Sequence, residues 1–367
     1  MDKKHSYIIS IILIVVFLTA AGMLLFAARR VDGFAQWYAV NVYPLCVGTI
    51  GRLSNLFTFS AAEKLCFLLP VLVIVDLIVS VIRKRIGGAL LRFVLLASIL
   101  LFLYSACCGV NYYNDPFVSK DLIETTEITE DDLEDFSLYV VDHLIANNSD
   151  DKTIIENNAE NAEAGVYFYP SDEELADKAI SAMQSVGDKR LDGYYPHPKM
   201  LSNLAGFFSS MGVTGIYSPF TVEANVNGEI PGMQKPFTAC HELSHLRGFM
   251  NEGEANYIGW LACIHSDDEA FRRSGWIIAY TYAGSALYKA DPDKFEELRK
   301  NVPESVIREL RENNEFWDTH MTEAAEVQDK VNDAYLKSNG LEDGVESYGK
   351  VLTLMLIWYK TADLSGI

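Results

Sequence analysis

The chain has 367 residues, half of them hydrophobic, yet it carries 30 Lys and Arg and 50 Asp and Glu, for a net charge of −20. These properties are compatible because they are segregated: residues 1–110 hold ten basic and four acidic side chains, a charge of +6, which leaves −26 for residues 111–367. A domain with this much negative charge repels nucleic acid, which excludes nucleic-acid binding as its function. The length is enough for two domains.

The first part, 1–110, is predicted to be a membrane domain with three transmembrane helices. Residues 7–28 carry no charge over a length that can cross a hydrocarbon core about 30 Å thick, and the stretch is longer than the apolar core of a cleaved signal peptide. Two further apolar stretches, 65–82 and 89–110, are expected to cross as well. The lipid bilayer is therefore an expected partner.

Basic residues near the spans predict the orientation. The lysines at 3–4 precede the first span and a basic cluster at 83–85 separates the second from the third, so both are expected in the cytoplasm. The chain is then a multi-pass protein of the bacterial cell membrane with an extracytoplasmic C-terminal domain. One acidic residue, Asp76, lies alone inside its span, where a function is conceivable. We favour the interpretation that it is tolerated against Arg52 or Lys64.

Residues 111–367 are typical of a mainly helical domain with a small sheet. Apolar residues recur at helical spacing over 131–147, Ser171 begins a capping box for a helix that runs to about 186, and 213–228 alternate as one or two strands. The intervening stretch 186–212 is rich in Gly, Pro, Tyr and Ser and is predicted to be irregular. Four more helical stretches are predicted, at about 267–289, 291–300, 304–338 and 344–361.

The chemistry is concentrated in an H-E-x-x-H motif. His241 and His245 are four residues apart, so on a helix both imidazoles project from one face and can share a metal. Glu242 lies beside the first ligand, where its carboxylate can contact a metal-bound water without ligating. This division predicts a catalytic Zn²⁺ site: the metal lowers the pKa of its water to about 7, and the carboxylate takes the proton and passes it to the leaving amine.

The third metal ligand has to come from the next helix. Gly248 can end the first helix in a left-handed cap, and a second helix is expected to start near Asn251 and to present Glu252 or Glu254. Glu252 shares a helix face with Asn256, so one can ligate while the other supports a histidine. Glu254 points about 160° away from Glu252, so the two do not bind one metal. We predict Glu252 as the ligand.

Two of the six cysteines fall in the same segment. None of the six lies in a C-x-x-C pattern, which argues against a zinc knuckle or a thioredoxin-like motif. Cys240 and Cys263 are either joined by a disulfide, which requires an extracytoplasmic domain, or are two buried free thiols.

At these residues the sequence resembles the gluzincin type of zincin metallopeptidases, in which a glutamate on a second helix completes the zinc site. The element 252–256 is similar to the Glu-x-x-x-Asp element of membrane-bound gluzincins such as the CAAX-processing and heat-shock HtpX-like peptidases. Asn256 stands where those have aspartate, and the gap of six residues between His245 and Glu252 is short for that group. Residues 241–248 also match the start of the metzincin motif, but Asn251 occupies its third-ligand position, so that resemblance is weaker.

More of the chain, from the N-terminal spans through Tyr217–Asn225 and Pro236–Phe249, resembles an uncharacterised bacterial family of multi-spanning membrane proteins assigned to the zincin clan. The resemblance implies a zincin-like fold and a metal, but no substrate. By analogy with gluzincins, Phe220–Val226 is expected to be the edge strand on which a peptide is laid antiparallel. Tyr217 or Asn225 would then face the scissile carbonyl.

The sequence thus predicts a membrane-anchored zinc metallopeptidase acting on a peptide or protein substrate, with Glu242 as catalytic base and His241, His245 and Glu252 as metal ligands. The alternative is a catalytically inactive zincin-like membrane sensor or interaction protein. No recognisable cytoplasmic signalling domain follows any span, which argues against the sensor.

Overall fold

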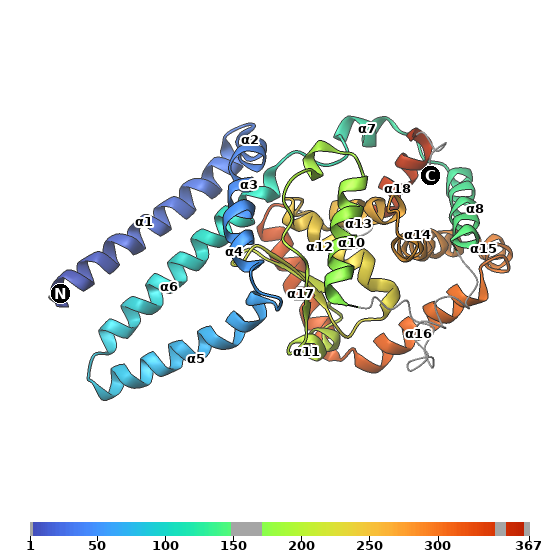
Figure 1. Cartoon of the computed structure of the whole chain (residues 1–367). Helices are drawn as coiled ribbons and strands as arrows, with labels where there is room; N and C mark the ends of the chain where they lie inside the picture. Colours follow the sequence, from blue (N-terminus) through green and yellow to red (C-terminus); the bar gives the residue numbers. More distant parts are fainter. Residues whose placement is uncertain (1–2, 148–170, 342–349, 363–367) are drawn as a thin grey trace. The chain divides into compact units, whose positions relative to one another are not determined.

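The computed structural model describes residues 3–147, 171–341 and 350–362, and the chain forms two compact units (Figure 1). The first unit is Met1–Asp115 together with Ser218–Glu223, and the second is Pro116–Tyr217 together with Ala224–Ile367. The chain passes from the first unit to the second just beyond the expected boundary at residue 110.

Three helices of the first unit are long and apolar enough to cross a membrane, as predicted. They are α1 (Lys3–Arg30), of which Tyr7–Arg30 is the apolar span, α5 (Ala61–Ile82) and α6 (Ile86–Cys107). Helices α1 and α6 lie side by side (Figure 1). In all three helices only 6–17 % of the apolar stretch is buried inside the protein, which associates this unit with a lipid bilayer.

The stretch between α1 and α5 is largely helical, although the sequence analysis assigned no element to it. It contains α2 (Phe34–Asn41), α3 (Tyr43–Cys46), the π-helix η1 (Val47–Gly51) and α4 (Arg52–Ser54), and the 3₁₀ helix η2 (Gly109–Tyr113) follows α6. Tyr38 fixes α2 to the end of α6, because its hydroxyl donates to Ala106 O at 2.9 Å.

The intramembrane carboxylate Asp76 pairs with Arg92 of α6, and not with Arg52 or Lys64 as the sequence analysis favoured. Arg92 Nη2 lies 2.9 Å from Asp76 Oδ1 and also donates to Ser80 Oγ at 2.9 Å. Asp76 and Arg92 stand at similar distances from the turn that joins α5 to α6, so the two helices bring them to the same depth. An ion pair at that depth avoids leaving either charge alone in hydrocarbon.

The segment Ser218–Glu223 belongs to the first unit because Glu223 closes the N-terminus of α5. The fully buried Glu223 carboxylate accepts hydrogen bonds from Ala61 N at 3.1 Å and Ala62 N at 2.7 Å, where the partial positive charge of a helix end favours an anion. The preceding Val222 has φ 51°, a conformation that β-branched residues rarely adopt.

The second unit is mainly helical with one small sheet, as predicted. Its elements are α7 (Lys120–Thr125), α8 (Glu130–Ala146), α10 (Asp172–Ser185), η3 (Lys189–Leu191), β1 (Lys199–Leu201), α11 (Ala205–Ser210), β2 (Gly215–Ser218), β3 (Glu223–Asn227), η4 (Gly232–Gln234), α12 (Lys235–Leu246), α13 (Glu252–Ile264), α14 (Glu269–Ala290), α15 (Pro292–Arg299), α16 (Glu304–His320), α17 (Glu323–Ser338) and α18 (Lys350–Thr361).

Two sequence predictions for this unit were wrong in detail. The region 186–212, expected to be irregular, contains β1 and α11. The helical stretch expected over 304–338 is two helices: the chain is extended at Met321, which ends α16, and Thr322 caps α17 by accepting a hydrogen bond from Ala324 N at 3.2 Å. The start of the helix predicted at 344–361 lies outside the described residues.

An aromatic core holds α13 between α8, α14 and α18. Trp260 of α13 is fully buried, and its ring contacts Trp358 edge to face at 4.9 Å and Trp276 at 6.3 Å between centroids. Phe136 of α8 packs on the same indole at 6.5 Å. Such rings contribute large apolar areas and preferred edge-to-face contacts, so this core fixes the position of the helix that bears Glu252.

The sheet has the strand order β1-β3-β2, and β3 is its centre. Strands β1 and β3 are parallel, with Lys199 opposite Asn225. Asn227 N donates to Thr214 O at 2.8 Å, and the side-chain amide of Asn225 donates to Ile216 O at 3.2 Å. Only residues 219–222 join β2 to β3, too few for a parallel crossover, so these neighbouring strands form an antiparallel hairpin. The expectation that 220–226 forms an edge strand is therefore wrong: β3 is covered on both sides, and β2 is the edge next to the motif helix.

Candidate metal centre

Helix α12 carries the H-E-x-x-H motif and ends as the sequence predicted. Gly248 has φ 96°, its N–H donates to His245 O at 2.9 Å, and Phe249 N donates to Ser244 O at 3.1 Å. These two bonds satisfy carbonyls at the helix end and reverse the chain within a few residues. Leu243 and Leu246 are fully buried, so the helix is anchored by the face opposite its histidines.

Helix α13 begins immediately after this turn. Asn251 is its N-cap and accepts a hydrogen bond from Glu254 N at 3.2 Å, so Glu252 is the first helical residue, as predicted. Gly259, two turns further on, lets α13 approach α12 closely: a Cβ at Gly259 would lie 3.0 Å from His241 N. The short turn and this close packing bring Glu252 against the two histidines.

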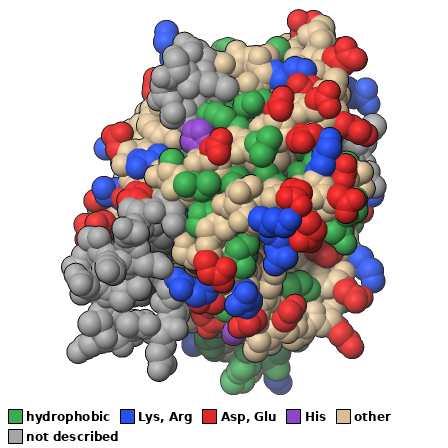
Figure 2. Space-filling model, turned by 90° about the vertical axis from the view of Figure 1, so that its right-hand side faces the viewer, with side chains coloured by type: hydrophobic (Ala, Val, Ile, Leu, Met, Phe, Trp, Pro, Cys, Tyr) green, Lys and Arg blue, Asp and Glu red, His purple; other side chains and the backbone are tan. Residues whose placement is uncertain are grey.

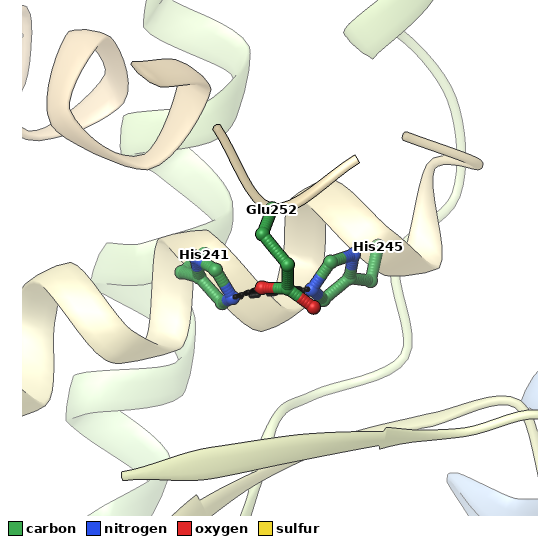
Figure 3. Close-up of side chains that lie close together, drawn as sticks. All are labelled: His241, His245 and Glu252. Carbon is green, nitrogen blue, oxygen red and sulfur yellow. Dashed lines mark hydrogen bonds and ion pairs between the residues drawn. The ribbon is translucent and has the colours of Figure 1, made fainter. Parts of the chain in front are cut away.

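The three predicted ligands converge (Figure 3). Glu252 Oε2 lies 3.4 Å from His241 Nε2 and 3.6 Å from His245 Nε2, and the two imidazole nitrogens are 3.1 Å apart. The carboxylate lies between the two rings, which stand at 90° to each other. Among the described residues, this is the group of His, Cys, Asp and Glu side chains whose ligand atoms meet closely enough to hold one ion.

The spacing fits a tetrahedral zinc ion. Zn–N and Zn–O bonds of about 2.0–2.2 Å at tetrahedral angles place neighbouring ligand atoms about 3.4 Å apart. The three observed separations, 3.1, 3.4 and 3.6 Å, bracket this value. Two imidazoles and one carboxylate also form a donor set that suits zinc and leaves a fourth position open.

Support from the surrounding chain differs between the two histidines. His245 Nδ1 lies 2.8 Å from Phe249 O, a contact that directs Nε2 toward the shared centre and that the sequence did not reveal. His241 Nδ1 is buried without a hydrogen-bond partner among the described residues. Asn256, considered as a support for a histidine, is buried on α13, and no hydrogen bond to either imidazole is found in the described part of the chain.

Electrostatics of the cluster favour an ion between these groups. Burial opposes ionisation of both His245 and Glu252, but their mutual attraction outweighs it. The neighbouring carboxylate raises the pKa of His245 to about 9, and the two histidines lower the pKa of Glu252 far below its ordinary value. The metal-free cluster therefore holds a proton beside an ionised carboxylate, and a cation can take the place of that proton.

Glu242 lies beside the cluster without belonging to it. Its side chain is only 3 % exposed, and Oε2 has no hydrogen-bond partner among the described residues. Burial raises the pKa of this carboxyl to about 7, against the lowering effect of His241 and His245. A buried carboxyl with an unused oxygen and a pKa near neutrality is suited to accept and return a proton.

Glu254 is separated from the ligands, as the helical wheel predicted. Its Oε1 accepts a hydrogen bond from Phe117 N at 2.7 Å, and Arg190, which donates to Phe117 O at 2.9 Å, stabilises the same segment. Tyr282 of α14 is a neighbour of the site that the sequence did not indicate. Burial, and then the charge of Glu252, raises the pKa of its hydroxyl.

The remaining site predictions concern the thiols and the strand residues. Cys240 and Cys263 are both free and buried, which is the second of the two alternatives considered. Tyr217 is buried in β2. Asn225 lies in the central strand, and its side-chain amide donates a hydrogen bond to Ile216 O.

The fold and site together define a membrane-associated helical protein with a potential two-histidine, one-glutamate metal centre. Comparison with family models shows that the chain belongs to a family described as "Protein of unknown function (DUF3810)", whose model matches residues 38–356. No curated protein and no solved structure matches the chain.

Proposed function

We propose that this protein is a membrane-anchored zinc metallopeptidase of the zincin type. The observation that carries the proposal is the convergence of three ligand atoms at zinc spacing beside a buried carboxylate with an unused oxygen. His241, His245 and Glu252 would hold Zn²⁺, which supplies Lewis acidity and an acidified water when bound. The resemblance to gluzincins supports the same assignment of residues.

In this proposal Glu242 is the general base and then the general acid. Its carboxylate takes a proton from the attacking water and returns it to the leaving amine nitrogen, a shuttle that works best when the pKa lies near the working pH. Burial of Glu242 on α12 excludes bulk water from this exchange and strengthens the charge interactions around it.

The proposed location is the outer face of a bacterial membrane. The basic residues before α1 and between α5 and α6 favour a cytoplasmic position for those ends, and with three spans the acidic second unit would then lie outside. Acidic and basic side chains are intermixed over the face shown in Figure 2, so the negative charge does not gather there into one patch that would select basic peptides. Peptides or proteins at the membrane surface are the proposed substrates.

Zinc content of the full-length chain in detergent tests the metal centre. We expect one zinc per chain in the wild type, and its loss in His241→Ala/His245→Ala and in Glu252→Gln. Glu254→Gln is the matched control, since it makes the same change two residues away and should keep the metal. Zinc absent from the folded wild type, or retained by the double variant, would sink the proposal.

Glu242→Gln separates catalysis from metal binding. We expect this variant to keep its zinc and to lose hydrolysis of a quenched fluorescent peptide library by several orders of magnitude, because the amide cannot shuttle a proton. A wild-type chain that binds zinc, cleaves no peptide, and has a cellular phenotype unaffected by Glu242→Gln would instead favour the inactive membrane sensor.

A further inference from the structure

Strand β2 passes so close to Glu242 that a side chain has no room at Gly215. A Cβ built at Gly215 would lie 2.6 Å from Glu242 Oε1 and 2.8 Å from Glu242 Cγ, and 2.8 Å from Asn225 O of the central strand. All three separations are shorter than side-chain carbons tolerate. The first residue of this edge strand therefore has to be glycine if the Glu242 carboxylate is to stay in its position.

The Glu242 side chain is buried, and hydrogen bonds from the described residues do not fix the direction of its free oxygen. The side chain is almost fully buried, and the neighbouring Leu243 and Leu246 fill the core side of the same helix. No described group donates a hydrogen bond to Oε2 and so fixes its direction. The backbone of β2 is thus a steric boundary that decides where the carboxylate lies relative to the ligands on α12 and α13.

We infer that Gly215 is a positioning residue for the general base: its missing side chain admits the Glu242 carboxylate to the place where it can serve the metal centre. The inference rests on the proposed function for the base, but the steric contact is testable without it. Gly215 itself touches no reacting atom in this account and acts only through Glu242.

The experiment uses zinc-loaded, full-length protein and three variants. Gly215→Ala should keep one zinc per chain, because no ligand is altered, and should cleave fluorescently labelled casein on the order of 10²-fold more slowly, the effect of moving a catalytic group by about 1 Å. Gly206→Ala is the control: it makes the same substitution on α11, where the nearest atom to the new Cβ is at 3.4 Å, and should behave as wild type. Glu242→Asp with Gly215 intact is the third variant: it withdraws the carboxylate by one methylene without altering a proposed ligand, so it should keep its zinc and lose rate to a comparable extent.

Thermal unfolding tests the steric contact between residue 215 and Glu242 even if casein is not cleaved. Gly215→Ala should lower the apparent Tm by about 3–10 °C. Adding Glu242→Ala should restore part of that loss, because it removes the clash with the side chain and leaves only the contact with Asn225 O. If the double variant is no more stable than Gly215→Ala, the conflict is with Asn225 O and the inference is wrong. A wild type that binds zinc but cleaves nothing overturns the proposed function instead.

Discussion

The buried carboxyl of Glu254 makes a sharp prediction about stability and pH. It lies at the start of α13, and burial raises its pKa from 4.5 to about 7, although the hydrogen bond from Phe117 N and the charge of Arg190 act in the opposite direction. The folded chain therefore keeps this proton at pH values where the unfolded chain has lost it.

The sign and size of the effect follow from that difference. Between pH 4.5 and 7 the folded state binds more protons than the unfolded state, so the free energy of unfolding falls as the pH rises. The difference between the pKa of Glu254 in the unfolded chain and in the folded chain corresponds to about 3 kcal/mol. The free energy of unfolding decreases by this amount as the pH rises past 7. Glu254→Gln cannot ionise, so in the metal-free chain it should be up to about 3 kcal/mol more stable than wild type at pH 8.5 and within about 1 kcal/mol of it at pH 5.

Urea unfolding with EDTA present, followed by tryptophan fluorescence, measures this difference, since Trp260 and Trp276 are fully buried in the core around α13. Glu173→Gln is the control: it removes an exposed carboxylate from the first turn of another helix and should show no comparable gain at pH 8.5. A Glu254→Gln variant less stable than wild type at pH 8.5 would refute the reasoning, because the carboxylate would then be ionised and stabilised in place.

Three other substitutions test the packing that holds the site. Gly259→Ala puts a methyl group 3.0 Å from His241 N, so we expect a loss of about 1–3 kcal/mol in unfolding free energy and weaker zinc binding in a chelator competition. Arg273→Met leaves the buried Glu309 without its partner at 2.8 Å and should cost about 3–5 kcal/mol by urea unfolding, whereas Arg273→Met/Glu309→Leu should recover most of that loss. Asn251→Ala removes the N-cap of α13 and should lower stability by about 1 kcal/mol; an unchanged unfolding midpoint would contradict its capping role.

The convergence of His241, His245 and Glu252 could be predicted from the sequence because their geometry is local. Spacing of four residues places His241 and His245 on one helix face, and glycine at 248 followed by asparagine at 251 marks the end of one helix and the start of the next. Those signals depend on neighbouring residues alone. The position of Glu252 then follows from a turn that has few conformations open to it.

Contacts between distant segments could not be predicted in the same way. Gly215 and Glu242 are 27 residues apart in the sequence, and nothing in the residues around either one indicates that they are in contact. Asp76 had several basic candidates, and only the packing of α5 on α6 selects Arg92. The central place of β3 depends on β1, whose three residues are too few to show a strand pattern.

The compactness of the ligand set along the chain has a consequence for folding. His241 and Glu252 bracket one tight reversal between two helices, so an ion that joins them closes a short loop and restricts the unfolded chain only slightly. Most of the stabilisation by zinc would then come from its bonds to the folded helix pair α12 and α13, and the metal would leave when that pair opens. Slowed amide hydrogen exchange on zinc binding should accordingly be greatest within Lys235–Ile264 and small in α16 and α17.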